Sequence, residues 1–211
     1  MYELKISVAK VLGTCTADPP MRPGQYFTVS NGDIRIPPGS YVCAWALHSL
    51  LPVITPKERK ILESQDDDWM WRVHHAQCPD PDGLVVFEIE RMENSGGATP
   101  PSVEATPPEP VDKMEGGLWN LQVVVDEVRG KCTSGMKPGD YFELRSGRLY
   151  IPAHRHFCLY ALQATFPFLT AKQRPLPDGD WLKRTNWILC PDPAGSVIMR
   201  IERMDSSSGG S

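Results

Sequence analysis

The sequence Cys-Pro-Asp-Pro at residues 78–81, followed by an apolar run that ends in Ile-Glu-Arg-Met at 89–92, decides how this chain is organised, because it occurs twice. The second copy has Cys-Pro-Asp-Pro at 190–193 and Ile-Glu-Arg-Met at 201–204. Further landmarks pair in the same order, namely Cys43 with Cys158, Pro52 with Pro167 and Trp69 with Trp181. A repeated set of landmarks predicts an internal duplication, with two copies of one structural unit.

The 211 residues therefore divide into two predicted units, residues 1–92 and 118–205. Residues 93–117 are rich in Pro, Gly, Ser, Thr and Glu, which predicts a flexible linker. The Ser- and Gly-only stretch 206–211 predicts a disordered tail. Units of about 90 residues bury a modest share of their surface, so we expect the two units to pack together as a pseudo-two-fold dimer.

Within each unit, the spacing of apolar residues predicts an α+β fold with a mostly antiparallel sheet. Alternating or β-rich runs predict strands in the first unit at 4–11, 26–29, 34–36, 70–77 and 84–89. Apolar residues at steps of three and four after Cys43 predict a helix that Pro52 kinks or ends. Thr55 followed by Pro56 predicts the start of a second helix running to Leu62.

Charge and hydropathy exclude some classes of protein. The formal net charge is −4 and no run of Lys or Arg exceeds two residues, which argues against a nucleic-acid partner. No segment approaches the roughly 18 apolar residues of a membrane-spanning helix. The first five residues carry charges where a signal peptide has its apolar core. We therefore expect a cytoplasmic protein whose six cysteines are thiols, with further self-association as an open possibility.

The motifs resemble a family of small, poorly characterised microbial proteins. That family has the pattern G-x-C-x-x-G-x-x-x-G-D-x-F, which residues 130–142 match, and C-P-D-P before its last strand. Its helix motif A-L-H-x-L-x-P matches residues 46–52. The resemblance covers both units and supports the fold of the unit. Some members of that family occur in biosynthetic gene neighbourhoods, and the resemblance implies no particular activity.

The two units depart from this pattern in opposite places. The first unit keeps His48 in the helix motif but loses the Gly-x-Cys-x-x-Gly loop, whereas the second keeps the loop and has Gln163 in place of the histidine. Such divergence predicts a single asymmetric site to which the units contribute unequally.

Three cysteines recur at matching places in the two units: Cys15, Cys43 and Cys78, then Cys132, Cys158 and Cys190. They lack the close Cys-x-x-Cys pairs of a zinc site, although three thiolates and a histidine could still converge in the first unit. The alternative is that these small, often buried side chains fill tight packing sites.

The candidate catalytic residues are His48, Cys78 and Asp80. A histidine beside an aromatic residue in a cleft can act as a general acid or base, although a structural histidine is the alternative. An ionised Cys78 could act as a nucleophile, whereas a Pro-Asp-Pro turn capped by the Asp80 carboxylate is the structural explanation. The predicted substrate-binding residues are Cys43, Trp45, Trp69, Trp71, His74, Tyr160, Gln163 and Trp181.

No nucleotide-binding loop, serine nucleophile elbow or HExxH motif is present in the sequence. We therefore expect a cofactor-independent enzyme of specialised metabolism that acts on a small, largely apolar molecule by cyclisation, isomerisation, dehydration or acyl release. An apolar pocket can pre-fold such a substrate and lower the entropic barrier. Two alternatives stay open: a Cys/His metal-binding module, and a non-catalytic ligand-binding or interaction protein.

Overall fold

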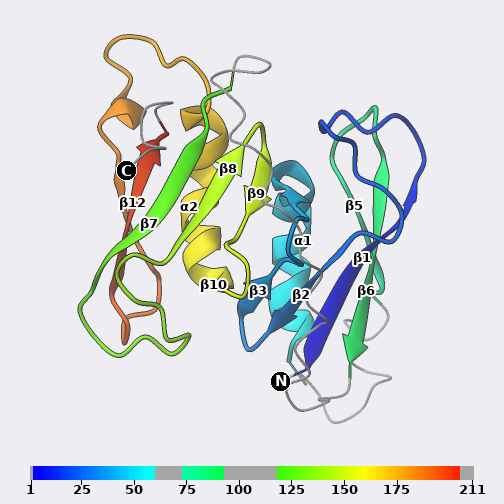
Figure 1. Ribbon diagram of the computed structural model, residues 1–211, viewed down its shortest axis with the longest axis horizontal. Helices are drawn as coiled ribbons and strands as arrows, with labels where there is room; N and C mark the ends of the chain where they lie inside the picture. The colour runs from blue at the N-terminus through cyan, green and yellow to red at the C-terminus, as the bar shows by residue number, and fades with distance from the viewer. Residues whose placement is uncertain (1, 60–72, 93–117, 205–211) are drawn as a thin grey trace.

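The protein is α+β, and the part of the chain that the structure describes forms two antiparallel six-stranded sheets and two α-helices. Figure 1 shows how these elements are arranged. The structure, a computed structural model, describes residues 2–59, 73–92 and 118–204. The predicted linker 93–117 and tail 206–211, together with Trp69 and Trp71, lie outside the described residues. No helix in the described part of the chain has the length and apolar character needed to cross a membrane.

The described part of the N-terminal half (residues 2–59 and 73–92) contains six strands and one α-helix. Their bounds are β1 Glu3–Val11, β2 Tyr26–Ser30, β3 Asp33–Arg35, β4 Val42–Cys43, α1 Ala44–Lys57, β5 His75–Gln77 and β6 Val85–Met92. The predicted strands in the described part of this half are confirmed, except that the strand predicted from residue 70 begins at His75 within the described residues.

The C-terminal half (residues 118–204) has the same order of strands and α-helix as the described part of the N-terminal half, and it also contains one short 3-10 helix. Their bounds are β7 Leu121–Val128, β8 Tyr141–Arg145, β9 Arg148–Tyr150, β10 Phe157–Cys158, α2 Leu159–Lys172, η3 Trp181–Lys183, β11 Trp187–Leu189 and β12 Val197–Arg203. The long strands β1 and β7 bury alternate residues in the same pattern, as a strand with one face on the core should.

Each half contributes one two-residue strand to the sheet of the other half. The sheet orders are β10-β3-β2-β1-β6-β5 and β11-β12-β7-β8-β9-β4. Strand β10 pairs with β3, so that Cys158 lies opposite Asp33, and β4 pairs with β9, so that Cys43 lies opposite Arg148. We call these two strand pairings the strand crossings. They place the first residue of α1, Ala44, against the turn at Gly147, and the first residue of α2, Leu159, against the turn at Gly32.

Both helices continue through proline. Helix α1 includes Pro52 and Pro56, and α2 includes Pro167, so the prediction of a second helix starting at Thr55 is wrong. A proline removes one backbone hydrogen bond from a helix. Pro52 and Pro167 are exposed, and so are His48 and Gln163, whose carbonyls lose their helical hydrogen bonds to these prolines. Water can therefore bind both carbonyls. Burial of the opposite face then holds the helix together.

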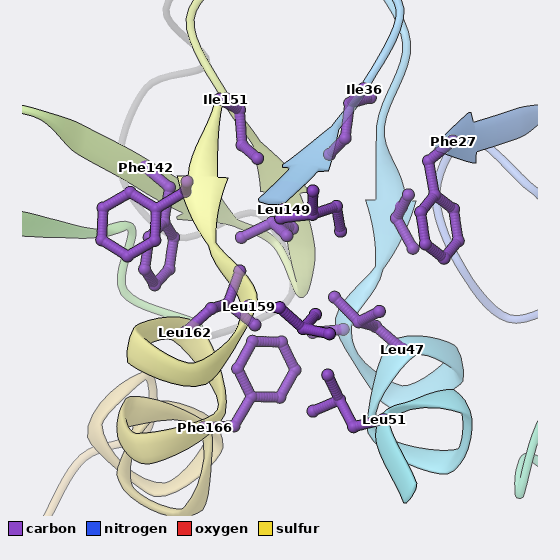
Figure 2. Close-up of a cluster of buried hydrophobic side chains, with 14 of the residues drawn as sticks. Phe27, Ile36, Leu47, Leu51, Phe142, Leu149, Ile151, Leu159, Leu162 and Phe166 are labelled. Carbon is purple, nitrogen blue, oxygen red and sulfur yellow. The ribbon is translucent and has the colours of Figure 1, made fainter. Parts of the chain in front are cut away.

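The apolar core is continuous between the two halves. Leu47 and Leu51 of α1 face Leu159 and Phe166 of α2, and all four side chains are buried (Figure 2). Leu51 and Phe166 occupy corresponding positions just before Pro52 and Pro167. The helix–helix seam therefore joins the halves through apolar packing as well as through the two strand crossings.

Candidate functional site

In each half, a Gly-x-Cys turn (residues 13–15 and 130–132) lies against the turn of the Cys-Pro-Asp-Pro motif. The amide of Gly13 donates to the Gly83 carbonyl at 3.1 Å, and Gly130 donates to the Gly195 carbonyl at 3.0 Å. A Cβ atom on Gly13 would lie 2.0 Å from the Asp82 carbonyl oxygen, so no side chain fits there. Glycine is thus required at these positions for close approach of two backbone segments.

The aspartate of each Cys-Pro-Asp-Pro motif caps its own turn. Oδ1 of Asp80 accepts a hydrogen bond from the Asp82 amide at 3.1 Å, and Oδ1 of Asp192 accepts one from the Ala194 amide at 3.0 Å. This bond to an amide two residues on is the one that the turn interpretation predicts. The repeat of the motif is explained by the turn in both halves.

In each half, a cavity lies beside the Gly-x-Cys turn and the Cys-Pro-Asp-Pro turn. Each cavity is lined by the three cysteines of its half. The N-terminal cavity is lined by Cys15, Cys43 and Cys78 and has a volume of about 160 Å³. The C-terminal cavity is lined by Cys132, Cys158 and Cys190 and has a volume of about 520 Å³. Only the C-terminal cavity falls within the range of about 300–1,000 Å³ that is usual for small-molecule sites.

The C-terminal cavity has an apolar floor and a polar rim. Buried side chains form the floor: Met136, Cys158, Ala161, Cys190 and Val197. Exposed or half-buried side chains form the rim: Asn31, Arg59, Thr133, Tyr160 and Asp192. An apolar pocket with a few polar groups at its edge is typical of a site for a small organic molecule.

Each cavity is completed by the opposite half. Asn31, Gly32 and Arg59 of the N-terminal half line the C-terminal cavity. The Ser146–Gly147 turn of the C-terminal half lines the N-terminal cavity in the corresponding place. The strand crossings explain this, because the Leu159 amide donates to the Gly32 carbonyl at 2.6 Å.

The N-terminal cavity differs from the C-terminal cavity in some of its lining side chains and in their contacts. Trp45 occupies the position that Tyr160 has in the C-terminal cavity. The Thr16 hydroxyl donates to Oδ2 of Asp80 at 2.7 Å, and this bond is the main cause that lowers the pKa of Asp80. Within the described residues, Thr133 makes no such bond to Asp192.

Burial favours the protonated form of four of the thiols. It raises the pKa of Cys43, Cys158 and Cys190, and raises that of Cys78 to about 11. Cys43 and Cys158 precede α1 and α2, and the first helix amides lower their pKa, but burial has the larger effect. At neutral pH these cysteines are thus thiols that pack as apolar groups, and a protonated Cys78 is a poor nucleophile.

The described residues offer no ready metal site. Within 2–59, 73–92 and 118–204, no group of three His, Cys, Asp or Glu side chains is placed to hold a metal ion. Burial favours protonated thiols at four of the cysteines, whereas a metal needs thiolates.

The two strand crossings differ in charge. At the β3–β10 crossing, His156 Nε2 lies 3.6 Å from Oδ2 of Asp33, and burial raises the pKa of Asp33. At the β4–β9 crossing, the Arg148 guanidinium lies over the Tyr41 ring at 5.5 Å, and burial raises the pKa of Tyr41. The β3–β10 crossing therefore carries an acid–histidine pair, and the β4–β9 crossing carries a cation–aromatic pair.

The predicted site residues divide between the two cavities and the outer surface. Cys43, Trp45, Cys78 and Asp80 line the N-terminal cavity, and Tyr160 lines the C-terminal cavity. The remaining described residues of the set are exposed and line neither cavity: His48, His74, Gln163 and Trp181. His74 is exposed, but partial desolvation of its ring, ahead of the neighbouring Lys57 charge, lowers its pKa.

Sequence reasoning missed the residues that enter the C-terminal cavity from the opposite half. Arg59 and Asn31 belong to the N-terminal half, and nothing in their local sequence marks them as part of a site. A systematic comparison of the halves would have paired Arg59 with Arg174, but it would not have told which of the two reaches a cavity.

In comparisons with known proteins, the chain matches no protein-family model, no curated protein and no solved structure. The resemblance to the small microbial family therefore stays a prediction.

Proposed function

We propose that this chain is a ligand-binding protein whose C-terminal cavity takes a small, largely apolar organic molecule. The observation that carries the proposal is a cavity of about 520 Å³ with a buried apolar floor and a polar rim drawn from both halves. The buried thiols favour this function, because protonated cysteines add apolar surface to the floor.

Binding has more geometric support than catalysis. His48 is exposed and lines neither cavity, and Cys78 and Asp80 line the smaller cavity, where Asp80 caps a turn. Turnover of the ligand by cyclisation, isomerisation, dehydration or acyl release stays a prediction, and it requires an acid or base other than His48. Asp192 is the carboxylate among the residues that line the C-terminal cavity, and its Oδ1 caps a turn as that of Asp80 does.

We also propose that the halves arose by internal duplication and pack as a pseudo-dimer. The repeated motifs, the common order of elements and the reciprocal exchange of β4 and β10 support this. On this proposal the two cavities have a common origin, and the N-terminal one has been closed by Trp45 and by the bond between Thr16 and Asp80.

The test is a ligand-observed NMR screen of small apolar fragments against three proteins: the wild type, Thr133→Trp and Thr16→Trp. Thr133 and Thr16 are exposed, occupy matching positions and line the C-terminal and N-terminal cavities, respectively. We expect fragments to bind the wild type and Thr16→Trp, and Thr133→Trp to lose them because the indole fills the cavity. Thermal melting checks that each variant is folded.

Chemical labelling locates the bound fragment. Cys132 and Cys15 are half-buried counterparts that line the two cavities. A bound fragment should slow the alkylation of Cys132 by iodoacetamide, with the rate at Cys15 unchanged, as read by mass spectrometry. Failure of every fragment to bind, or equal binding by Thr133→Trp, would overturn the proposal.

A further inference from the structure

The rim of the C-terminal cavity carries a fixed cation from the opposite half. Arg59 follows Glu58, the residue that caps the C-terminus of α1. Its backbone is held by Arg91 of β6, whose Nη2 donates to the Arg59 carbonyl at 3.1 Å. The backbone that presents the guanidinium to the cavity is therefore anchored.

The Arg59 side chain is oriented by two neutral partners. Nη1 donates to the Thr55 carbonyl at 2.6 Å, and Nη2 donates to the Tyr160 hydroxyl. The guanidinium carbon lies 5.9 Å from the centroid of the Tyr160 ring. An arginine has five N–H donors, so these contacts fix the group without using all of them. Among the residues that the structure describes, no carboxylate forms an ion pair with Arg59.

Its counterpart in the C-terminal half lacks this setting. Arg174 also donates from Nη1 to a carbonyl one turn back, Thr170 at 2.6 Å, and its own carbonyl accepts from Arg203. It does not line the N-terminal cavity, where Trp45 replaces Tyr160 and offers no hydroxyl at that place. The cation on the rim is therefore particular to the larger cavity.

We infer that the ligand of the C-terminal cavity is an organic monocarboxylate, an inference that rests on the proposed ligand-binding function. Its carboxylate binds the remaining N–H groups of Arg59, and the Tyr160 hydroxyl, which accepts from Arg59, donates its own proton to the same group. The apolar body of the ligand lies on Met136 and Val197. Asp192 on the rim repels a second negative charge, so dicarboxylates are disfavoured.

Isothermal titration calorimetry with two matched probes tests this inference. The probes are 4-phenylbutyrate and its neutral amide, which share an apolar body and differ in charge. We expect the wild type to bind the carboxylate about tenfold or more tightly than the amide, as is usual for hydrogen bonds to a charged group.

Variants then assign the preference to Arg59. Arg59→Gln should bind both probes equally, with the affinity for the amide unchanged, and Arg59→Lys should retain part of the preference. Tyr160→Phe should reduce the preference a few-fold. Arg174→Gln is the matched control and should behave as the wild type, because Arg174 lines neither cavity.

The outcomes separate this inference from the function on which it rests. Equal binding of the two probes by the wild type, or a preference that survives in Arg59→Gln, overturns carboxylate recognition and leaves the binding function standing. The same holds if neither probe binds at millimolar concentration while the neutral fragments do bind. Loss of all fragment binding in the wild type overturns both.

Discussion

The N-terminal and C-terminal cavities have the same framework and different contents. Both are bordered by a Cys-Pro-Asp-Pro turn, three cysteines and a hairpin turn from the opposite half. The C-terminal cavity has about 520 Å³ and a cation on its rim, whereas the N-terminal cavity has about 160 Å³. The comparison teaches that the repeated motifs build the walls of a cavity, while the side chains that differ between the halves, such as Trp45 and Tyr160, set the two cavities apart.

The largest expected loss of stability comes from substitutions in the seam between α1 and α2, which the two halves share. Phe166→Ala should lower the free energy of unfolding by about 3–5 kcal/mol, and Leu51→Ala by about 2–5 kcal/mol, because each leaves a cavity in the buried core. Urea unfolding followed by both circular dichroism and tryptophan fluorescence measures this.

Since the seam belongs to both halves, we expect one cooperative transition in each variant. Two separated transitions, or a loss below about 1 kcal/mol for Phe166→Ala, would contradict the shared core.

The next prediction tests whether the close contact between the Gly-x-Cys turn and the Cys-Pro-Asp-Pro turn contributes equally to stability in the two halves. Gly13→Ala and Gly130→Ala should each lower stability by about 2 kcal/mol, because a Cβ atom would lie 2.0 and 2.1 Å from a carbonyl oxygen of the facing turn. Gly135→Ala is the control: it has open space around it but a φ of +67°, so we expect a loss of about 1 kcal/mol from backbone strain alone. Denaturant melts of the three variants give the comparison, and a harmless Gly13→Ala would show that the turns do not need this contact.

Much of the framework could be predicted from the sequence. The period-two runs and glycine turns identified the long strands, and the cysteines of each half were recognised as counterparts. The strands β4 and β10 could not be predicted, because two residues such as Phe157 and Cys158 are too short to show a period. Without them nothing indicated that Arg59 reaches the C-terminal cavity. The helix prediction failed at Thr55 because burial of one helical face outweighs the hydrogen bond lost at a proline.

Substitution of Glu58, the buried residue that caps the C-terminus of α1, should have a smaller effect on stability and of opposite sign. Oε1 of Glu58 accepts from the Gly32 amide at 2.9 Å, but Oε2 is buried without a hydrogen-bond partner. Its counterpart Gln173 donates from Nε2 to the Trp119 carbonyl at 3.1 Å. Glu58→Gln should therefore stabilise the protein by about 1 kcal/mol at pH 7.

This stabilisation should depend on pH. Burial raises the pKa of Glu58 above its usual 4.5, so the folded state binds the proton more tightly than the unfolded state. The wild type then loses stability as pH rises from about 4.5 through the raised pKa, and Glu58→Gln does not. Thermal melts between pH 4 and pH 8 should show the two proteins diverging over that range. A constant difference, or a less stable variant, would be the contrary result.

The smallest effect on stability is expected for His48, the residue of the helix motif that the sequence predicted to be catalytic. His48→Ala and its counterpart Gln163→Ala should each change stability by no more than about 0.5 kcal/mol, because both side chains are exposed. Neither should alter fragment binding, since neither lines a cavity. A His48→Ala variant that folds normally but loses binding would place the site on the outer face of α1 instead.

The most direct test of the difference between the cavities is a crystal structure of the protein soaked with 4-phenylbutanamide, a probe that does not depend on the charge of Arg59. We predict ligand density on the floor of the C-terminal cavity, over Met136 and Val197, and none beside Trp45 in the N-terminal cavity. Density in the N-terminal cavity, or an empty C-terminal cavity in crystals that hold the probe elsewhere, would contradict the claim that only one half kept a site.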